Sequence, residues 1–578
     1  PMELGLIAVV GVIVLVGTSI LGGRIGIAAP LLLVVVGIGA GYLPFIPLIE
    51  IDPEIILLGV LPPLLYAAAV NVPLVDFRRN FRPVIGLSVL LVIISAIIIG
   101  ALVHLVVPVI PFPVAIALGA VVSPTDAVAA TSIGKRLGMP DRVVSILEGE
   151  SLVNDATSLV LLKTALAAIA GSFVFWDAAG SFAFSVAAAV VVGLVMGLVT
   201  VWIRSHLRNP VYDTMISFVV PFVAFIPAEA IDASGVLAVV VTGLYTGHHA
   251  SRRFSATARM NERLNWRTVQ FALENGVFLL MGLQLHALVE EVGNTALRVE
   301  HVGLLSIMVV VILIICRAGF MLPMIAAMRG TSRLYEQRRD GLSVLAQRVR
   351  DEDDPDTRKL HRVELMEQRS NADLAHERDQ KLGWREGTVL SWSGMRGVVT
   401  LAAAQSIPVE VPYRAQLILV AFGVAVVTLL LHGLTLPPLI RKLWPEGAGA
   451  GASASELASL RKDLIEAGDD AIDDAVANEE GTPERDRTAP GIIEKARGAS
   501  RSAMISLTPS FAETGAIVLP ADETPAQSYV RIARLALDAQ RSALLEERAI
   551  GRYSSEALRA AELALDVHEA RLSPPSRQ

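Results

Sequence analysis

The chain has 578 residues, of which 53% are hydrophobic and only 18% are charged, and its mean hydropathy is +0.57. A soluble globular protein carries about 25% charged residues, so this composition excludes an ordinary soluble protein and indicates a membrane protein. The net charge of −7 suggests no nucleic-acid partner. The single cysteine, Cys316, excludes an intramolecular disulfide.

The apolar residues are gathered into runs that are long enough to cross a bilayer, which takes about 20 residues in a helix. The first run, from Leu4 to Leu21, lacks the basic start and the cleavage site of a signal peptide, so we expect it to be retained as a helix. The chain then predicts an all-α polytopic membrane protein with thirteen transmembrane helices. These spans cover residues 3–22, 25–45, 54–73, 81–108, 112–135, 142–171, 175–203, 211–228, 233–249, 266–288, 300–328, 385–406 and 413–440.

Basic and acidic residues alternate in successive loops between these spans. The basic loops contain Arg24, Arg78, Arg79, Arg82, Lys135, Arg136, Arg142, Arg204, Arg208, Arg252, Arg253, Arg259, Arg263, Arg441 and Lys442. The acidic loops contain Glu50, Asp52, Asp177, Glu229, Asp232, Glu290, Glu291 and Glu410. Because basic loops stay in the cytoplasm, we expect a multi-pass protein of the cell inner (plasma) membrane with its N-terminus outside and its C-terminus inside.

Most of the charged residues lie in two regions outside these spans. Residues 329–385 are predicted to be a cytoplasmic helical insertion in a transmembrane domain that covers residues 1–445. Residues 446–526 carry too little apolar surface to fold and are predicted to be a flexible cytoplasmic linker. Residues 527–578 recover a helical period and predict a soluble cytoplasmic helical hairpin that breaks at Gly551. This hairpin is either a self-packing tail or a regulatory or dimer-stabilising module.

Two of the predicted spans contain residues that interrupt a helix near its middle. In the fifth span, Pro124 removes a backbone donor and disfavours helix at the preceding residue. In the twelfth span, Gly394 and Gly397 flank Arg396. Non-helical backbone at membrane depth is tolerated only inside protein or beside a watered cavity. Interrupted helices at corresponding positions of two halves indicate the substrate site of a transporter.

The two interruptions do occupy corresponding positions. Spans 2–6 and spans 9–13 form two sets of five helices, and the interruption falls in the fourth helix of each set. Because seven spans separate corresponding helices, the two sets are inverted in topology. Two inverted five-helix repeats favour alternating access over a simple pore.

The sixth span is unusually polar in the stretch "EGESLVNDATSLVLLK". Ser151 and Asp155 lie one helical turn apart, and so do Glu150 and Asn154. Carboxylates at this depth are rare and mark ion or proton pathways. If the fifth and sixth spans pack as neighbours, Asp126 approaches Asp155.

Two carboxylates in one desolvated site favour keeping a proton on one of them. Carboxylate, hydroxyl, amide and carbonyl oxygens also suit Na⁺ or Li⁺, as they suit other hard cations. A site that holds either a proton or a cation, and that cannot cross the membrane empty, is an obligate exchanger. The residues therefore predict a secondary antiporter that exchanges H⁺ for Na⁺ or Li⁺, and not an enzyme.

Other functions fit the sequence less well or differ only in the cation. A K⁺/H⁺ antiporter with the same fold is the nearest alternative, since cation choice depends on geometry that sequence does not show. A symporter of an organic anion would need anion-binding groups, whereas Asp126 and the sixth span are acidic. A channel would carry rings of charge along a pore rather than one cluster. No G-x-x-x-x-G-K-[ST] motif occurs, so an ion gradient must drive transport, and no cofactor is expected.

Four motifs resemble those of bacterial sodium/proton antiporters of the cation/proton antiporter 1 group, the NhaP type. They are "SPTDAV", "GESLVNDA", "SWSGMRGVVTLAAA" and "VTLLLHGLTLPPLI", and the resemblance extends in order over about residues 1–445. It implies a homodimer whose thirteen-helix subunits each have a dimer domain and a mobile core domain. It also implies that the interrupted spans 5 and 12 cross one another.

The resemblance also implies roles for residues at the matching positions. Asp155 would be the principal carrier of the ion and the proton, and Asp126, Ser151 and the backbone of Thr125 would complete the Na⁺ site. Electrogenic relatives have a second aspartate where this chain has Asn154, so Asn154 implies electroneutral exchange of one proton per cation.

A buried ion pair of the family corresponds to Glu150 and Arg396, which would brace the sixth span against the crossing. One residue departs from the family pattern, because Ala67 stands where many members have a glutamate. This difference bears on ion affinity and pH range.

Several other polar residues at depth are placed outside the ion site. Arg317 is expected to be a buried partner or a cavity-lining charge, without an identified carboxylate. Glu274 is expected to be structural. Lys163 is expected to reach the outer interface, and Glu148 lies near the cytoplasmic end of the sixth span.

Overall fold

The computed structural model describes residues 2–25, 29–43, 54–170, 175–207, 209–293, 299–328, 331–351, 357–379, 382–445, 454–479, 488, 490–505 and 525–572. Every regular element within these ranges is a helix, in agreement with the predicted all-α class. Three of the predicted loop residues lie outside the described ranges, namely Glu50, Asp52 and Arg208. The chain divides into two compact units, each of which is described by itself.

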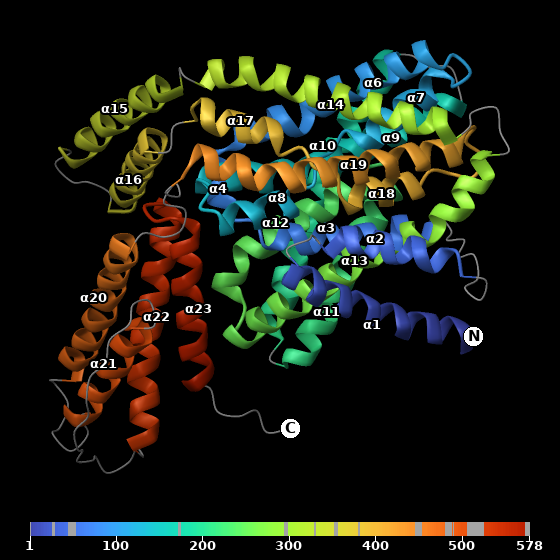
Figure 1. Ribbon diagram of the computed structural model, residues 1–578. Coiled ribbons are helices and arrows are strands. Elements are labelled where there is room, and N and C mark those ends of the chain that lie inside the picture. The colour runs from blue at the N-terminus through green and yellow to red at the C-terminus, as the bar shows by residue number, and fades with distance from the viewer. Residues whose placement is uncertain are drawn as a thin grey trace. The chain divides into compact units, whose positions relative to one another are not determined.

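The first unit comprises Pro1–Arg253, Asn261–Arg329 and Leu382–Ala448. Its helices run through the blue, green and orange parts of Figure 1. In chain order they are α1 (Met2–Ile25), α2 (Ala29–Gly41), the π-helical η1 (Ile55–Val60), α3 (Leu61–Val70), α4 (Leu74–Arg79), α5 (Phe81–Ile85), the π-helical η2 (Gly86–Leu91), α6 (Val92–Val106), α7 (Phe112–Val122), α8 (Ala127–Arg136), α9 (Asp141–Ala170), α10 (Phe175–His206), α11 (Pro210–Glu229), α12 (Gly235–Arg253), α13 (Ala256–Gly293, whose first residues belong to the second unit), α14 (Val299–Met328), α17 (Trp384–Trp392), α18 (Val398–Gln405) and α19 (Arg414–Leu443).

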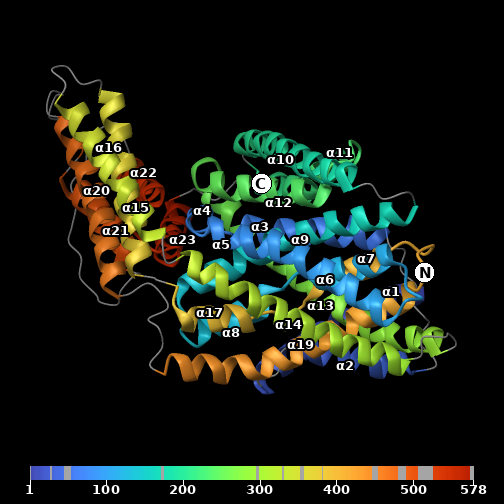
Figure 2. The same cartoon turned by 90° about the horizontal axis from the view of Figure 1, so that it is seen from above.

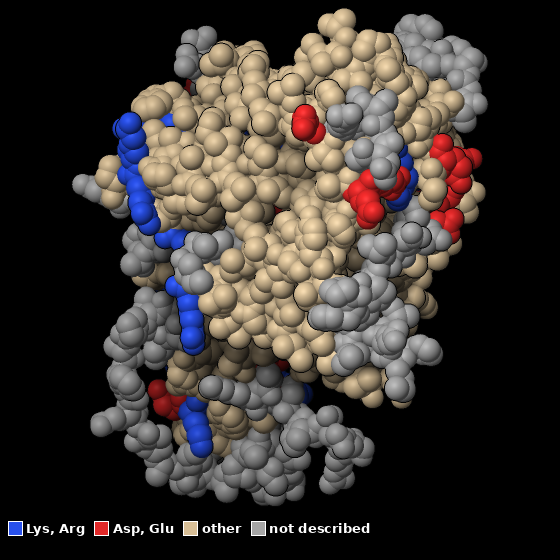
Figure 3. Space-filling view, turned by 45° about the vertical axis from the view of Figure 1, so that its right-hand side comes forward, with Lys and Arg blue, Asp and Glu red and all other residues tan. Residues whose placement is uncertain are grey.

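Many of these helices have the length and composition of membrane spans. Among the described residues, seven stretches qualify: Phe81–Val106, Asp141–Ile169, Ala179–His206, Pro210–Glu229, Ala256–Val292, Val299–Met328 and Arg414–Leu443. Shorter apolar helices occur at Val9–Gly22, Ala29–Gly41, Ile55–Val70 and Phe112–Val122. Figure 3 shows a broad face on which most side chains are uncharged, with Lys and Arg side chains along its left edge and most of the Asp and Glu side chains at its right edge. The protein is therefore a multi-pass membrane protein, while the count of thirteen spans stays a prediction.

Two groups of helices in the first unit can be distinguished by their contacts. The first group consists of α3, α10, α11 and α12, which pack on one another. The second group is built around α9, which packs mainly against α7, α8 and η2 and has smaller contacts to the first group; α6 joins the second group through α7. In Figure 2, α10, α11 and α12 lie along one side of this unit. Close approach within the second group depends on small residues, since a Cβ at Gly119 of α7 would meet the carbonyl oxygen of Ala96 on α6. On the outside, α10 leaves Leu198 and Trp202 exposed, which suits contact with lipid.

The second unit comprises Phe254–Met260, Gly330–Lys381 and Gly449–Gln578. Its helices are α15 (Thr331–Arg350), α16 (Thr357–Asp379), α20 (Ala454–Glu479), α21 (Pro490–Ile505), α22 (Pro525–Ile550) and α23 (Ser555–Leu572). In the insertion, α15 and α16 pack against each other around Ala346 and Val363. Between α22 and α23, Gly551 has a φ of 76°, a conformation that glycine adopts without strain.

The predicted linker 446–526 differs from the structure, because α20 and α21 lie within it. Leu460 of α20 and Ile492 of α21 are buried against residues of α22. Helix α22, which lies later in the sequence, supplies the apolar partner surface that this polar segment lacks by itself. The linker prediction is therefore wrong for these two helices, and residues 446–453 and 506–524 lie outside the described part.

Candidate functional site

The two interrupted spans cross at their non-helical segments. Residues 123–126 separate α7 from α8, and residues 393–397 separate α17 from α18. At the crossing, the backbone N–H of Asp126 donates a hydrogen bond to the carbonyl oxygen of Met395 at 2.8 Å. The interruptions predicted at Pro124 and around the twelfth-span glycines are therefore present, and they contact each other directly.

Each of the two non-helical segments carries one charged side chain, and that side chain lies at helix ends of opposite partial charge. The Asp126 carboxylate accepts hydrogen bonds from the N–H of Val128, at 2.8 Å, and from the N–H of Val398, so it lies at the N-termini of both α8 and α18. The Arg396 guanidinium donates to the carbonyl oxygen of Val122 at 2.9 Å, at the C-terminus of α7. An anion at helix N-termini and a cation at a helix C-terminus are both stabilised by the helix dipole.

The local sequence explains why the two segments approach so closely. A Cβ at position 397 would overlap the Asp126 carboxylate, so Gly397 is required there. Pro124 has no N–H that would be left without an acceptor in the break. The hydroxyl of Ser123 forms a hydrogen bond of 2.9 Å with Ser95 of α6. The interruption is thus held by neighbouring helices at membrane depth, as non-helical backbone there requires.

One face of α9 lies against the crossing. The Asn154 amide donates to the carbonyl oxygen of Thr125 at 3.1 Å and to its hydroxyl at 3.0 Å. The Ser151 hydroxyl accepts a hydrogen bond from the N–H of Ala127 at 3.4 Å. Asp155 follows directly after Asn154, is only 7% exposed, and interacts electrostatically with Asp126. The structure brings together the five residues predicted for the ion site, which are Thr125, Asp126, Ser151, Asn154 and Asp155.

Asp155 differs from the other residues of this group in its lack of partners. Its carboxylate has no hydrogen bond and no ion pair among the described residues. The charged groups that act on it are Asp126 and Glu150, both acidic. The side-chain oxygen of Asn154 is likewise buried without a hydrogen-bond partner. A buried carboxylate in such surroundings is costly, and either a proton or a bound cation would offset that cost.

Glu150 is paired with Arg317, and not with Arg396 as predicted. Arg317 of α14 donates from both terminal nitrogens to the two Glu150 oxygens, with the longer bond at 2.8 Å. Its third donor, Nε, reaches the carbonyl oxygen of Leu390 in α17 at 2.7 Å. Thr125 also donates to Glu150 at 2.7 Å. The predicted Glu150–Arg396 pair is therefore wrong, and the brace joins α9 to α14 and α17.

The choice between the two arginines follows from what else each one contacts. The side-chain donors of Arg396 are used by backbone carbonyls at the crossing, including those of Gly394 and Val122. A small cavity lies beside this pair, and its lining combines apolar side chains with Ser95, Ser123, Glu150, Arg317 and Arg396. Arg396 acts on Glu150 only electrostatically. The sequence signal for Arg317, a lone charge in an apolar run, did indicate a buried partner.

Glu148 and Lys163, which lie on either side of the site residues in α9, each form an ion pair with another helix. Glu148 pairs with Lys135 of α8 at 2.8 Å. Lys163 pairs with Glu229, the last residue of α11. In α3, position 67 is a fully buried alanine, so it supplies no carboxylate.

Sequence reasoning gave no site role to Glu274 of α13, although the structure connects it with the site. Its carboxylate accepts a hydrogen bond from Gln270, one turn earlier, at 2.7 Å, and interacts electrostatically with Asp126. The available signal was an acidic residue at membrane depth.

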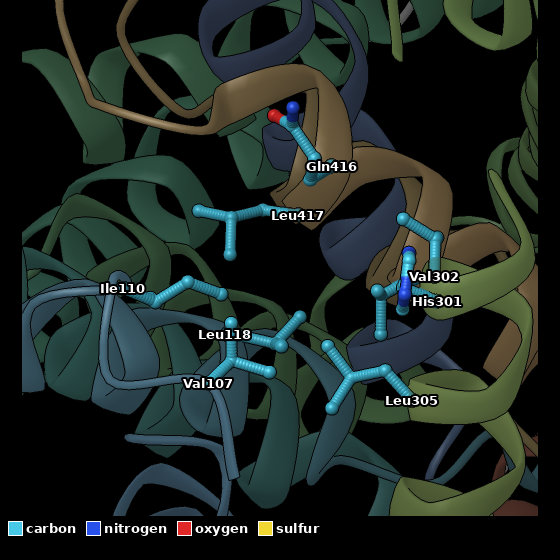
Figure 4. A pocket seen from close by; sticks show the side chains of 9 residues that line it. Val107, Ile110, Leu118, His301, Val302, Leu305, Gln416 and Leu417 are labelled. Carbon is cyan, nitrogen blue, oxygen red and sulfur yellow. The ribbon is translucent and has the colours of Figure 1, made fainter. Parts of the chain in front are cut away.

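A separate pocket lies between α7, α14 and α19 and is shown in Figure 4. Its walls are mostly apolar, with Leu118, Leu305 and Leu417 facing the space. None of the predicted ion-site residues lines it. Within the described residues, no group of three or more His, Cys, Asp or Glu side chains could hold a resident metal ion. Asp126 and Asp155, with the hydroxyl, amide and carbonyl oxygens around them, are instead suited to a transported monovalent cation.

A multi-pass helical protein in which two broken helices cross beside a buried carboxylate has the architecture of a secondary ion transporter. Residues 10–442 match the family described as "Sodium/hydrogen exchanger, transmembrane". The chain belongs to this family, and it is therefore a cation/proton antiporter rather than an enzyme. This result confirms the resemblance drawn from the four sequence motifs.

Relatives agree with this assignment. The chain is 28% identical to an uncharacterized Na⁺/H⁺ exchanger of Mycobacterium tuberculosis over 590 aligned residues, covering 99% of this chain and 97% of the relative. It is 30% identical to the uncharacterized Na⁺/H⁺ exchanger YjcE of Escherichia coli, covering 72% of each chain. The solved structure of the sodium proton antiporter MjNhaP1 from Methanocaldococcus jannaschii at pH 8 has the same fold, with a TM-score of 0.56 and 17% identity over 76% of this chain and 97% of that one.

Proposed function

We propose that the protein exchanges one H⁺ for one Na⁺ or Li⁺ by alternating access, with Asp155 as the carrier of both. The observation that carries this proposal is the buried Asp155 carboxylate, which has no donor and no cationic partner among the described side chains. Two carboxylates in electrostatic contact favour binding of one positive charge between them. A proton and a small cation would therefore compete for the same place.

The cation would bind to Asp155 and Asp126, with the Ser151 hydroxyl and the Thr125 carbonyl as further ligands. Ser151 accepts only a long hydrogen bond of 3.4 Å, and a carbonyl oxygen that already accepts from Asn154 has a second lone pair. Hard oxygen ligands of this kind suit Na⁺ and Li⁺.

The proposed stoichiometry rests on Asn154. Its neutral amide leaves Asp126 and Asp155 as the two carboxylates of the site. A proton and a monovalent cation each bring one positive charge to the same carboxylate. Exchange of one for the other then moves no net charge across the membrane.

The proposed setting is a homodimer in the plasma membrane, with the N-terminus outside and the C-terminus in the cytoplasm. Two inverted five-helix repeats would place the two broken helices across one another. The direct hydrogen bond between Asp126 and Met395 at the crossing supports this arrangement.

Purified protein in liposomes with a pH-sensitive dye inside tests the proposal. Steps of external Na⁺ or Li⁺ should drive proton flux through the wild type and not through Asp155→Asn, which keeps the shape of the side chain but cannot carry a charge. Asp141→Asn, at the first residue of the same helix, is the matched control and should keep the flux. Full flux through Asp155→Asn would reject the site, and flux driven by K⁺ but not by Na⁺ would favour the K⁺/H⁺ alternative.

A further inference from the structure

The ion pairs at the two ends of α9 differ in what they connect. Lys135–Glu148 joins α8 to α9, which belong to the same group of packed helices. Lys163–Glu229 joins α9 to the end of α11, which packs mainly against α3, α10 and α12. One pair therefore lies within the group that carries the exchange site, and the other links that group to its neighbour.

The positions of the two pairs along α9 bracket Asp155. Glu148 precedes it by seven residues and Lys163 follows it by eight, which correspond to about 10 Å and about 12 Å at 1.5 Å per residue. By the loop charges, the Lys163 end is the predicted outer side. The link between the helix groups is therefore on the outer side of the site.

Glu229 is held in position by the turn that follows it. Its Oε1 accepts a hydrogen bond from the N–H of Gly235, the first residue of α12, at 2.8 Å. Its Oε2 is the atom that pairs with Lys163. The turn contains Asp232 in a left-handed conformation with a φ of 58°. The hydrogen bond from Gly235 therefore fixes the orientation of the Glu229 carboxylate towards α9.

We propose that Lys163 and Glu229 form an outer gate, an ion pair that must separate before the Asp155 site can open to the outside. This inference rests on the proposed alternating access, because the gate matters only if α9 moves relative to α11 and α12. The side chains are 43% and 27% exposed. Neither charge is fully buried, so the pair is of the weaker, partly exposed kind and is breakable during a transport cycle.

Cross-linking provides the test. With Cys316→Ser removing the native thiol, Lys163→Cys/Glu229→Cys is treated in liposomes with a short bis-thiosulfonate reagent that a reductant reverses. Exchange should fall at least tenfold and return after reduction. Lys135→Cys/Glu148→Cys, cross-linked in the same way, should keep exchange within about twofold, because that pair lies within one helix group.

A second measurement tests whether the opposite charges at positions 163 and 229, and not the identity of the two side chains, set the exchange rate. Lys163→Met and Glu229→Gln should each change the exchange rate by about twofold to fivefold, as expected for a partly exposed pair. The swapped variant, Lys163→Glu/Glu229→Lys, should return towards the wild-type rate.

Undiminished exchange by the cross-linked Lys163→Cys/Glu229→Cys protein would overturn the gate, and so would a failure of these two positions to cross-link. Neither result would contradict the proposed function. The proposed function is contradicted if the wild type shows no cation-driven proton flux.

Discussion

Glu150 and Asp155 are two buried acidic residues of one helix, five positions apart. They differ in whether the carboxylate has a partner. Glu150 is 1% exposed, holds both terminal nitrogens of Arg317 and accepts a further hydrogen bond from Thr125. Asp155 is 7% exposed and has no such partner among the described residues. A paired buried carboxylate is a fixed part of the scaffold, whereas an unpaired one can bind and release a cation.

The largest effect on the fold is expected at the paired carboxylate. Glu150→Gln leaves the Arg317 guanidinium buried without a counter-charge, which costs about 3–5 kcal/mol. We expect low yield and a clearly lowered unfolding temperature in detergent. In contrast, Asp155→Asn should leave the unfolding temperature unchanged or raised, because it removes a buried charge that has no partner.

The double variant Glu150→Gln/Arg317→Met sharpens this difference. Removing both charges should restore much of the stability that Glu150→Gln loses, since no buried ion is left alone. If the double variant is as unstable as the single one, the pair is not the source of the loss.

An intermediate effect is expected when a third carboxylate is added to the site. Asn154→Asp places a second acidic group directly beside Asp155, so the site would carry more negative charge than one cation neutralises. We expect exchange to become dependent on membrane potential, measured in liposomes with the potential clamped by K⁺ and valinomycin. Asn154→Gln, which keeps the amide, is the control and should remain independent of potential. Strong potential dependence in the wild type would contradict the one-for-one stoichiometry.

The smallest effect is expected at the hydroxyl ligand. Ser151→Ala removes one neutral oxygen from the proposed cation site and should raise the apparent KM for Na⁺ by about threefold, with little change in maximal rate. Ser158→Ala, on the same helix, is the matched control, because its hydroxyl donates to the carbonyl oxygen of Ala120 at 2.8 Å and is not a proposed ligand. Equal effects of the two variants would remove Ser151 from the site.

The sequence was most informative where local chemistry decides the structure. Pro124 and the glycines that flank Arg396 cannot continue a regular helix, and both positions are non-helical in the structure. The long apolar runs predicted membrane helices, because a helix satisfies its backbone hydrogen bonds within its own segment. The polar face of α9 also followed from spacing alone, since residues one turn apart share a face.

Tertiary structure decided the matters that depend on residues far apart in the chain. Glu150 had two buried arginines available in the sequence. Only the tertiary structure selects Arg317, because α14 packs against α17 and its Arg317 side chain reaches both Leu390 of α17 and Glu150 of α9. The sequence also failed to predict α20 and α21, because the apolar residues of these helices are buried against α22, which lies later in the chain.

The sequence by itself therefore determined the membrane class, the two interruptions and the cluster of polar groups on α9, all of which arise from properties of neighbouring residues. Only the tertiary structure decided which of those groups are neutralised, because a charge at depth is compensated by whichever partner the packing brings within reach. That difference leaves Asp155 as the proposed site of exchange, with Glu150 as the brace beside it.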